Sequence, residues 1–142
     1  NAIYQDFPFD PAFSWTARLR YAENLFRLGA PDRALSTLRV LERERPERHD
    51  VLTLKGDIRR ELKEFSAAIR AYSQAIERVD AGAPENWSLF YARGIAYERA
   101  GRWPQAEKDL KAALRLNPDQ PFVLNYLGYS WIDMGINIRE GK

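Results

Sequence analysis

The chain has 142 residues, a net charge of +2 and no cysteine, with 45% hydrophobic and 30% charged residues. These proportions are ordinary for a folded protein, and no apolar run approaches the roughly 20 residues that span a bilayer. The lack of cysteine excludes disulfides, thiol catalysis and thiolate metal sites. Basic and acidic residues are interleaved along the chain, which argues against a nucleic-acid surface.

The N-terminal residues 1–14 are predicted to form the tail of a preceding helix, at residues 2–4, followed by a linker rich in proline and phenylalanine. Such a stretch can be a Pro-rich recognition segment. Because it is so short, a linker whose phenylalanines cover an exposed edge of the next element is the better interpretation.

Four successive segments share one pattern: residues 15–48, 49–86, 87–120 and 121–142. Each carries a small residue at the same phase, and in the first three another small residue follows twelve positions later. The first set is Ala22, Gly56, Gly94 and Gly128, of which the last two are 34 residues apart. The chain is therefore an array of similar repeats, here numbered 1 to 4.

Within each repeat, apolar residues recur at helical spacing and restart after a break, which predicts two helices. In repeat 3, Phe90 belongs to the first helix and Leu110 to the second, with a break at Gly101. A turn this short makes the two helices antiparallel neighbours. Small residues permit a close crossing, so we expect Gly94 to lie against Ala106, with the periodic aromatic residues in the core around it.

The pattern resembles the tetratricopeptide repeat, a 34-residue helix pair with the motif W-x2-L-G-x2-Y, then A-x3-F, then P. The matching positions of repeat 3 are Phe90, Arg93, Gly94, Tyr97, Ala106, Leu110 and Pro118. Repeat 4 begins with the same motif, at Leu124, Leu127, Gly128 and Trp131. The resemblance covers nearly the whole chain and implies an all-α fold without strands, a right-handed α-solenoid of antiparallel helix pairs.

Two departures from the family pattern carry information. Repeat 2 has Asp80 where the pattern has proline, and the extra residues before repeat 3 predict a longer surface loop at 80–84. Repeat 4 holds a first helix and only a truncated second helix, so part of its packing surface lacks a partner. We therefore expect the chain to be a fragment of a larger array.

Residues that could support catalysis or bind a metal are sparse. His49 is the single histidine and stands beside a predicted helix start, where a surface role is the ordinary one. No phosphate-binding glycine loop, nucleophile motif or metal-ligand spacing is present in the sequence. We predict no enzyme activity, no cofactor and no metal.

The resemblance implies that the first helices of successive repeats line a concave face that binds extended peptides or partner helices. Transfer by position within the repeat gives the predicted partner-binding residues Arg20, Glu23, Arg27, Asp57, Arg60, Tyr91, Ile95, Arg99, Asn125, Tyr126, Tyr129 and Asp133. The same transfer places Thr16, Leu19, Asp50, Thr53 and Leu54 on this face.

The predicted face has two characters. Repeats 1 and 2 present mixed charges that suit a polar ligand, whereas repeats 3 and 4 present a tyrosine-rich patch. Tyrosine and arginine are frequent binding hot spots. The alternative interpretation is that these tyrosines merely pack between adjacent first helices.

One subtype of the family is argued against by the residues present. Chaperone-binding members clamp C-terminal carboxylates with lysine, asparagine and arginine at fixed concave positions. Here those positions hold Leu19, Glu23, Leu54, Ser88 and Ala92, which cannot neutralise two carboxylates.

The leading hypothesis is a non-catalytic scaffold that binds a peptide or helix of another protein in the concave groove. The alternatives are an assembly module that self-associates through exposed repeat ends and, with less support, an RNA-binding helical repeat. The run at 124–131 resembles large bacterial repeat proteins, some exported and lipid-anchored, that act as adaptors. We expect a soluble domain, cytoplasmic or periplasmic in a bacterium, with no membrane insertion.

Overall fold

The computed structural model describes residues 14–133, and the side chains among them up to residue 128. The elements in chain order are α2 (Trp15–Arg27), α3 (Pro31–Glu44), α4 (His49–Glu61), α5 (Phe65–Glu77), the 3-10 helix η2 (Pro84–Asn86), α6 (Trp87–Arg99), α7 (Trp103–Leu116) and α8 (Pro121–Asp133). No strand occurs in this described range.

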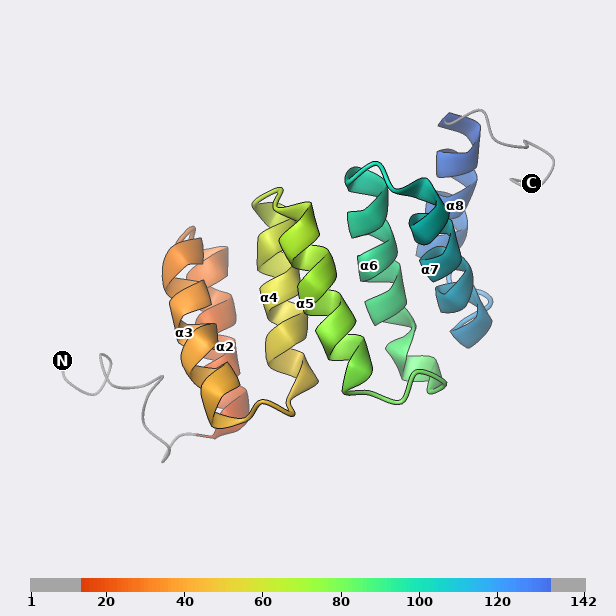
Figure 1. Ribbon diagram of the computed structural model, residues 1–142. Coiled ribbons are helices and arrows are strands. Elements are labelled where there is room, and N and C mark those ends of the chain that lie inside the picture. The colour runs from red at the N-terminus through yellow and green to blue at the C-terminus, as the bar shows by residue number, and fades with distance from the viewer. Residues whose placement is uncertain (1–13, 134–142) are drawn as a thin grey trace, which may run out of the picture. The chain divides into compact units, whose positions relative to one another are not determined.

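The chain divides into two compact units, with the boundary between Arg78 and Val79. The N-terminal unit contains α2 to α5, and the C-terminal unit contains η2 and α6 to α8. In the first, α2 packs on α3, α4 packs on α5, and α3 contacts α4 (Figure 1). In the second, α6 packs on α7, which contacts α8.

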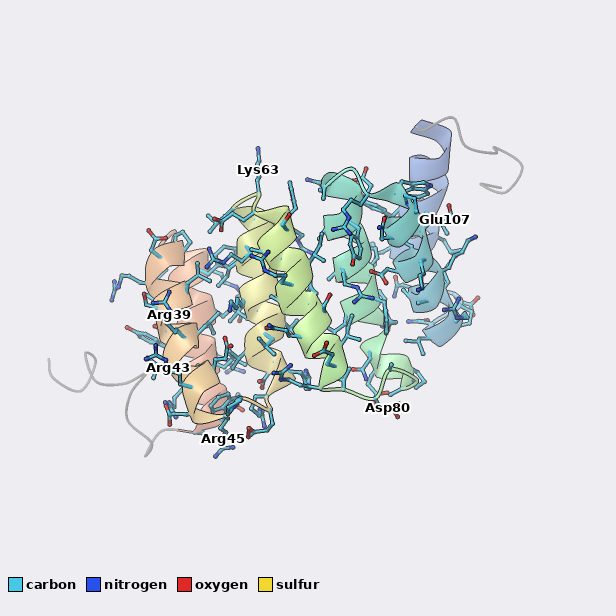
Figure 2. The ribbon with its side chains drawn as sticks, viewed as in Figure 1. Arg39, Arg43, Arg45, Lys63, Asp80 and Glu107 are labelled. Carbon is cyan, nitrogen blue, oxygen red and sulfur yellow. The ribbon has the colours of Figure 1, made fainter. Side chains whose placement is uncertain are left out.

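Three tight turns of one design join the paired helices. The turn residue has a positive φ in each: 84° at Gly29, 62° at Lys63 and 78° at Gly101. The next backbone N–H returns to a carbonyl of the finished helix, as Ala30 N does to Leu25 O at 2.9 Å. These bonds pair carbonyls that a helix end leaves open. The Lys63 side chain extends away from its turn (Figure 2), and its left-handed backbone costs about 1 kcal/mol relative to glycine.

The small residues Gly56 and Gly94 each lie in close contact with the second helix of their own repeat. A Cβ on Gly94 would lie 3.1 Å from Leu110 atoms and 3.3 Å from the Asp109 Cβ, so these two side chains lie nearest to Gly94. Ala106, the contact expected from the sequence, is buried in the core of the same unit.

Each unit has its own apolar core. In the N-terminal unit it comprises Ala22, Leu25, Ala34, Leu38, Leu41, Val51, Leu54 and Ile58. In the C-terminal unit it comprises Trp103, Ala106, Leu110, Ala113, Val123 and Leu127. The periodic aromatic Trp103 is buried in the core, as the sequence predicts.

The predicted helix tail at 2–4 and the truncated second helix of repeat 4 lie outside the described residues. Ser14 caps α2, since its Oγ accepts a hydrogen bond from Ala17 N at 3.1 Å. In the segment predicted as a loop, the Asp80 carboxylate accepts a bond from Gly82 N at 3.0 Å, and Asn86 Nδ2 donates to Asp80 O at 2.7 Å. Side-chain bonds to the backbone thus shape this connection before α6.

Candidate partner-binding groove

Two adjoining hollows lie between α2 and α4 in the N-terminal unit. The first has a volume of about 360 Å³ and is lined by Thr16, Leu19, Arg20, Glu23, His49, Asp50, Thr53, Leu54 and Asp57. The second, of about 450 Å³, is lined by Glu23, Phe26, Arg27, Leu54, Asp57, Arg60 and Glu61. Because they share three lining residues, we treat them as one surface, the α2/α4 groove.

Helical periodicity explains why these residues gather. On α2 the lining positions follow one another at intervals of one, three or four residues, which keeps them on one face. The other face of α2 carries Ala22 and Leu25, which are buried in the core. The groove therefore faces outward while α2 packs inward, and the same holds for α4 through Val51 and Ile58.

Five of the predicted partner-binding residues meet in this groove: Arg20, Glu23, Arg27, Asp57 and Arg60. The additional positions given by transfer also line it, namely Thr16, Leu19, Asp50, Thr53 and Leu54. Leu19 and Leu54 supply an apolar floor, and charged side chains stand around it. The mixed-charge wall expected from the sequence is thus formed within a single compact unit.

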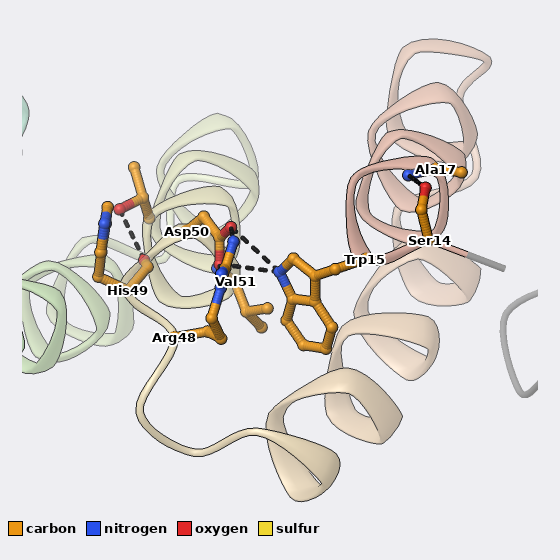
Figure 3. A network of polar contacts seen from close by, with 8 residues as sticks. Ser14, Trp15, Ala17, Arg48, His49, Asp50 and Val51 are labelled. Carbon is orange, nitrogen blue, oxygen red and sulfur yellow. Dashed lines mark hydrogen bonds and ion pairs between the residues drawn. The ribbon is translucent and has the colours of Figure 1, made fainter. Parts of the chain in front are cut away.

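One end of the groove is held by a polar network around Asp50 (Figure 3). Trp15 Nε1 donates to Asp50 Oδ2 at 3.1 Å, and Arg48 Nη2 donates to the same oxygen at 2.5 Å. Val51 N donates to Asp50 Oδ1 at 2.9 Å. Burial raises the pKa of Asp50, but the bonds from Arg48 and Trp15 outweigh it, so the pKa lies below its usual value. Asp50 is therefore an ionised anchor that ties the start of α2 to the start of α4.

Three guanidinium groups surround the Trp15 ring. Those of Arg45 and Arg48 lie 5.3 Å from its centroid, and that of Arg18 lies 5.9 Å away. Arg18 is buried and pairs with Glu44 of α3, with Nη1 to Oε1 at 3.2 Å. Cation–π contacts of this kind stabilise the ring position, so the end of the groove is rigid.

A second carboxylate is positioned from behind α4. Tyr72 of α5 is fully buried, and its hydroxyl donates to Asp57 Oδ1 at 2.5 Å. The Asp57 side chain remains 38% exposed toward the groove. Burial raises the pKa of Asp57 most; the bond from Tyr72 and the charge of Arg60 lower it, and Glu23 and Glu61 raise it further. The net result is a pKa above the usual value for aspartate.

The remaining groove charges form loose ion pairs within their own helices. Arg27 Nη2 lies 3.5 Å from Glu23 Oε1, and the Arg27 side chain is 70% exposed. Arg60 Nη2 lies 3.9 Å from Asp57 Oδ1. An exposed pair such as that of Arg27 contributes little to stability, and the Arg60 side chain is less exposed, at 27%.

The tyrosines predicted in the C-terminal unit are paired with each other. The rings of Tyr91 on α6 and Tyr126 on α8 meet edge to face, with centroids 6.2 Å apart, and Trp87 lies 5.8 Å from Tyr91. Tyr126 donates its hydroxyl to Glu98 Oε2 at 3.0 Å. Both tyrosines pack against the core of this unit while staying partly exposed.

Among the other predicted residues of this unit, Arg99 lies close enough to the Tyr126 hydroxyl to lower its pKa. Ile95 is partly buried, whereas Arg99 and Asn125 are exposed. The side chains of Tyr129 and Asp133 lie outside the described part of the structure. The tyrosine patch is therefore described only through Tyr91 and Tyr126.

The titration of the Tyr126 hydroxyl tests its contact with Glu98. Burial and then the charge of Glu98 raise its pKa to about 12. Because an unfolded tyrosine titrates near 10, the folded chain holds this proton longer, and stability falls as the pH rises from about 10 to 12. In a residue-resolved NMR titration, Glu98→Gln should bring the pKa of Tyr126 down toward 10, and Glu107→Gln should not. A Tyr126 pKa that stays near 12 in Glu98→Gln would contradict the contact.

The sequence did not predict that three residues line the α2/α4 groove or hold its carboxylates in place. His49 was assigned a plain surface role, yet it lines the first hollow. Trp15 and Tyr72 fit an apolar pattern, and that pattern says nothing about where an indole N–H or a phenol O–H points. Trp15 and Asp50 are 35 residues apart, so only the packing of α2 on α4 brings them together.

The described residues provide neither a metal-binding cluster nor a membrane-spanning helix. Between residues 14 and 133, no group of three or more histidine and acidic side chains could hold a metal ion. None of the helices in that range is both long and apolar enough to cross a bilayer.

Antiparallel helix pairs with tight turns and an outward groove define an all-α solenoid of the helical-repeat class. A family model described as tetratricopeptide repeat matches residues 53–121. The chain is 31% identical over 126 residues to the TPR repeat-containing protein PA4667 of Pseudomonas aeruginosa, covering 89% of this chain and 21% of that protein. These matches support a tetratricopeptide-repeat protein, and the relative agrees with the bacterial source expected from the sequence.

Solved structures share the fold. The crystal structure of MamA matches with a TM-score of 0.76 at 18% identity, over 87% of this chain and 68% of that one. PilF of Pseudomonas aeruginosa matches with a TM-score of 0.74 at 22% identity, over 82% of this chain and 51% of that one. Tetratricopeptide-repeat proteins generally act as protein–protein interaction scaffolds, bind other proteins and are typically non-catalytic.

Proposed function

We propose that the α2/α4 groove binds a segment of a partner protein, either extended or helical. The observation that carries this proposal is the groove itself, an outward hollow with an apolar floor and polar groups held in place. Leu19 and Leu54 offer apolar contact, while Thr16 and Thr53 stand on the two walls. Binding sites commonly combine a mostly apolar lining with a few oriented polar groups.

The rigidity of the groove supports the same proposal. Asp50 is held by Trp15 and Arg48, and Asp57 is held by Tyr72. A preformed surface loses less conformational entropy when a ligand binds. The walls of this groove are therefore suited to recognition without prior rearrangement.

The tyrosine-rich patch is a second proposed binding surface, which lies in the C-terminal unit. Its members from the sequence prediction are Tyr91, Ile95, Arg99, Asn125, Tyr126, Tyr129 and Asp133. Tyr91 and Tyr126 are partly exposed, which leaves ring surface for a ligand. The two rings also pack on each other between α6 and α8. Part of their surface is therefore not available to a ligand.

Filling the groove should abolish binding without unfolding the unit. Thr53 is partly exposed and lines the first hollow, so Thr53→Trp should obstruct it. We expect peptides selected by the wild-type chain from a random 12-residue display library to bind Thr53→Trp at least about tenfold more weakly, roughly 1.4 kcal/mol. Fluorescence anisotropy measures the affinity, and circular dichroism checks the helix content.

The matched control is Ser36→Trp, which places the same side chain on an exposed position of α3 outside the groove. It should bind the selected peptides like the wild type.

A second candidate function is assembly through α8, where Phe122 and Leu124 are 66% and 48% exposed. Peptides that bind Thr53→Trp normally but are lost in Phe122→Ser would contradict the groove and favour α8.

A further inference from the structure

We propose that the α2/α4 groove selects a segment carrying a lysine or arginine, whose cationic group inserts between Glu23 of α2 and Asp57 of α4. An apolar neighbour in the same segment contacts Leu19 and Leu54. This inference rests on the proposed function and adds the chemical class of the partner segment. Its basis is the position of the carboxylates, their rigidity and the weakness of their present partners.

The first step is position. Glu23, Leu54 and Asp57 are the lining residues that the two hollows have in common. The junction of the hollows therefore combines two carboxylates with one leucine. A segment lying along the groove has to cross this point, where an apolar contact and an anionic pair are next to each other.

The second step is rigidity. Asp57 has a short side chain, and the buried Tyr72 hydroxyl holds its Oδ1 from behind α4. Gly56 makes this possible, because a Cβ there would lie 2.6 Å from the Tyr72 ring. The Asp57 carboxylate, which lines the groove, is thus positioned through the body of the helix by a bond to one of its two oxygens.

The third step compares the cations already present. Arg20 is exposed, and Arg27 is 70% exposed on a long flexible side chain. The nearest ion-pair distances are 3.5 Å for Arg27 with Glu23 and 3.9 Å for Arg60 with Asp57. Long, intrahelical pairs of this kind are weak. An incoming ammonium or guanidinium group can displace these arginines toward solvent and form shorter bonds.

The fourth step is the local charge balance. The groups that act on Asp57 are Tyr72 from α5, Glu23 from α2, and Arg60 and Glu61 from its own helix. Burial together with Glu23 and Glu61 raises the pKa of Asp57, which means that its charged form is not fully compensated. A bound cation supplies the missing compensation, whereas an anionic segment increases the repulsion.

Peptide selection on the full chain provides the test. Peptides from a random 12-residue display library are divided into those lost in Thr53→Trp, which depend on the groove, and those retained. We expect lysine or arginine to be enriched in the groove-dependent set. In one selected peptide, replacing the basic residue with norleucine should weaken binding at least about tenfold, and replacing it with glutamate should weaken it more.

Protein variants locate the contact. Asp57→Asn and Glu23→Gln should each weaken the selected basic peptide several-fold and reduce its advantage over the norleucine peptide. Tyr72→Phe keeps the ring but frees Asp57, so it should weaken the basic peptide and leave the norleucine peptide unchanged. The charge control is Asp32→Asn, on an exposed position of α3, which should bind like the wild type.

The outcomes separate this inference from the function on which it rests. Groove-dependent peptides without basic residues, or a basic peptide that binds Asp57→Asn and Glu23→Gln like the wild type, would overturn the charge selection and leave groove binding intact. A library that yields no groove-dependent peptide would overturn both proposals.

Discussion

Gly56→Leu is expected to lower the free energy of unfolding by about 3 kcal/mol, the upper range for overpacking a core. A Cβ at this position would lie 2.6 to 2.9 Å from three atoms of the Tyr72 ring. The ring cannot retreat easily, because it is fully buried and its hydroxyl is bonded to Asp57. Urea denaturation followed by circular dichroism at 222 nm measures the loss.

A matched control and a second background isolate the ring contact. Gly82→Leu changes an exposed loop glycine, and a Cβ there would lie 3.5 Å from its nearest neighbour, Asp80 Oδ1. This substitution should therefore shift stability by no more than about 0.5 kcal/mol. In a Tyr72→Leu background, Gly56→Ala should be neutral or stabilising by up to about 1 kcal/mol, since alanine favours helix. An equal cost of Gly56→Ala in both backgrounds would show that the ring contact is not the cause.

Asp109→Ala should lower the free energy of unfolding by about 3 kcal/mol, the scale for leaving one member of a buried ion pair unpaired. Arg93 and Asp109 form two hydrogen bonds, at 2.7 and 2.8 Å, and their side chains are 20% and 5% exposed. Burial lowers the pKa of Arg93, but the bonds and charge of Asp109 raise it above its usual value. Arginine is effectively always protonated in proteins, so the guanidinium stays charged when Asp109 is removed, and chemical denaturation measures the cost.

The double variant Arg93→Met with Asp109→Leu tests the origin of that cost. It should recover most of the lost stability, because an apolar pair of similar volume often replaces a buried ion pair without loss. Lys111→Ala, which removes a more exposed pair with Glu107 on the same helix, should change stability by less than about 1 kcal/mol. If the double variant were as unstable as Asp109→Ala, lost packing rather than an unpaired charge would be responsible.

Much of the fold was predictable because the same spacing of apolar and small residues recurs in every repeat. The returning small residues and the helical spacing predicted antiparallel helix pairs and a solenoid, and the structure and the family match confirm them. The period did not reveal the register between paired helices, and the structure shows that the side chains nearest to Gly94 are those of Leu110 and Asp109.

The candidate site was predictable as a face but not as a set of contacts. Transfer by position located Glu23 and Asp57 on the groove side of their helices, because helical periodicity determines which face a residue occupies. It left open whether the tyrosines bind a partner or pack between adjacent first helices, and the structure shows that Tyr91 of α6 packs on Tyr126 of α8. Side-chain pairing between helices depends on how far apart and at what angle they pack.

The sequence by itself determined the class of the protein, the helix pairs and the residues on the outward face, since these follow from local periodicity. Only the tertiary structure decided which polar groups meet. Trp15 reaches Asp50 across 35 positions, and Tyr72 reaches Asp57 across 15. The physical reason is that a hydrogen bond depends on distance and direction between helices, and neither is encoded in the spacing of residues along one of them.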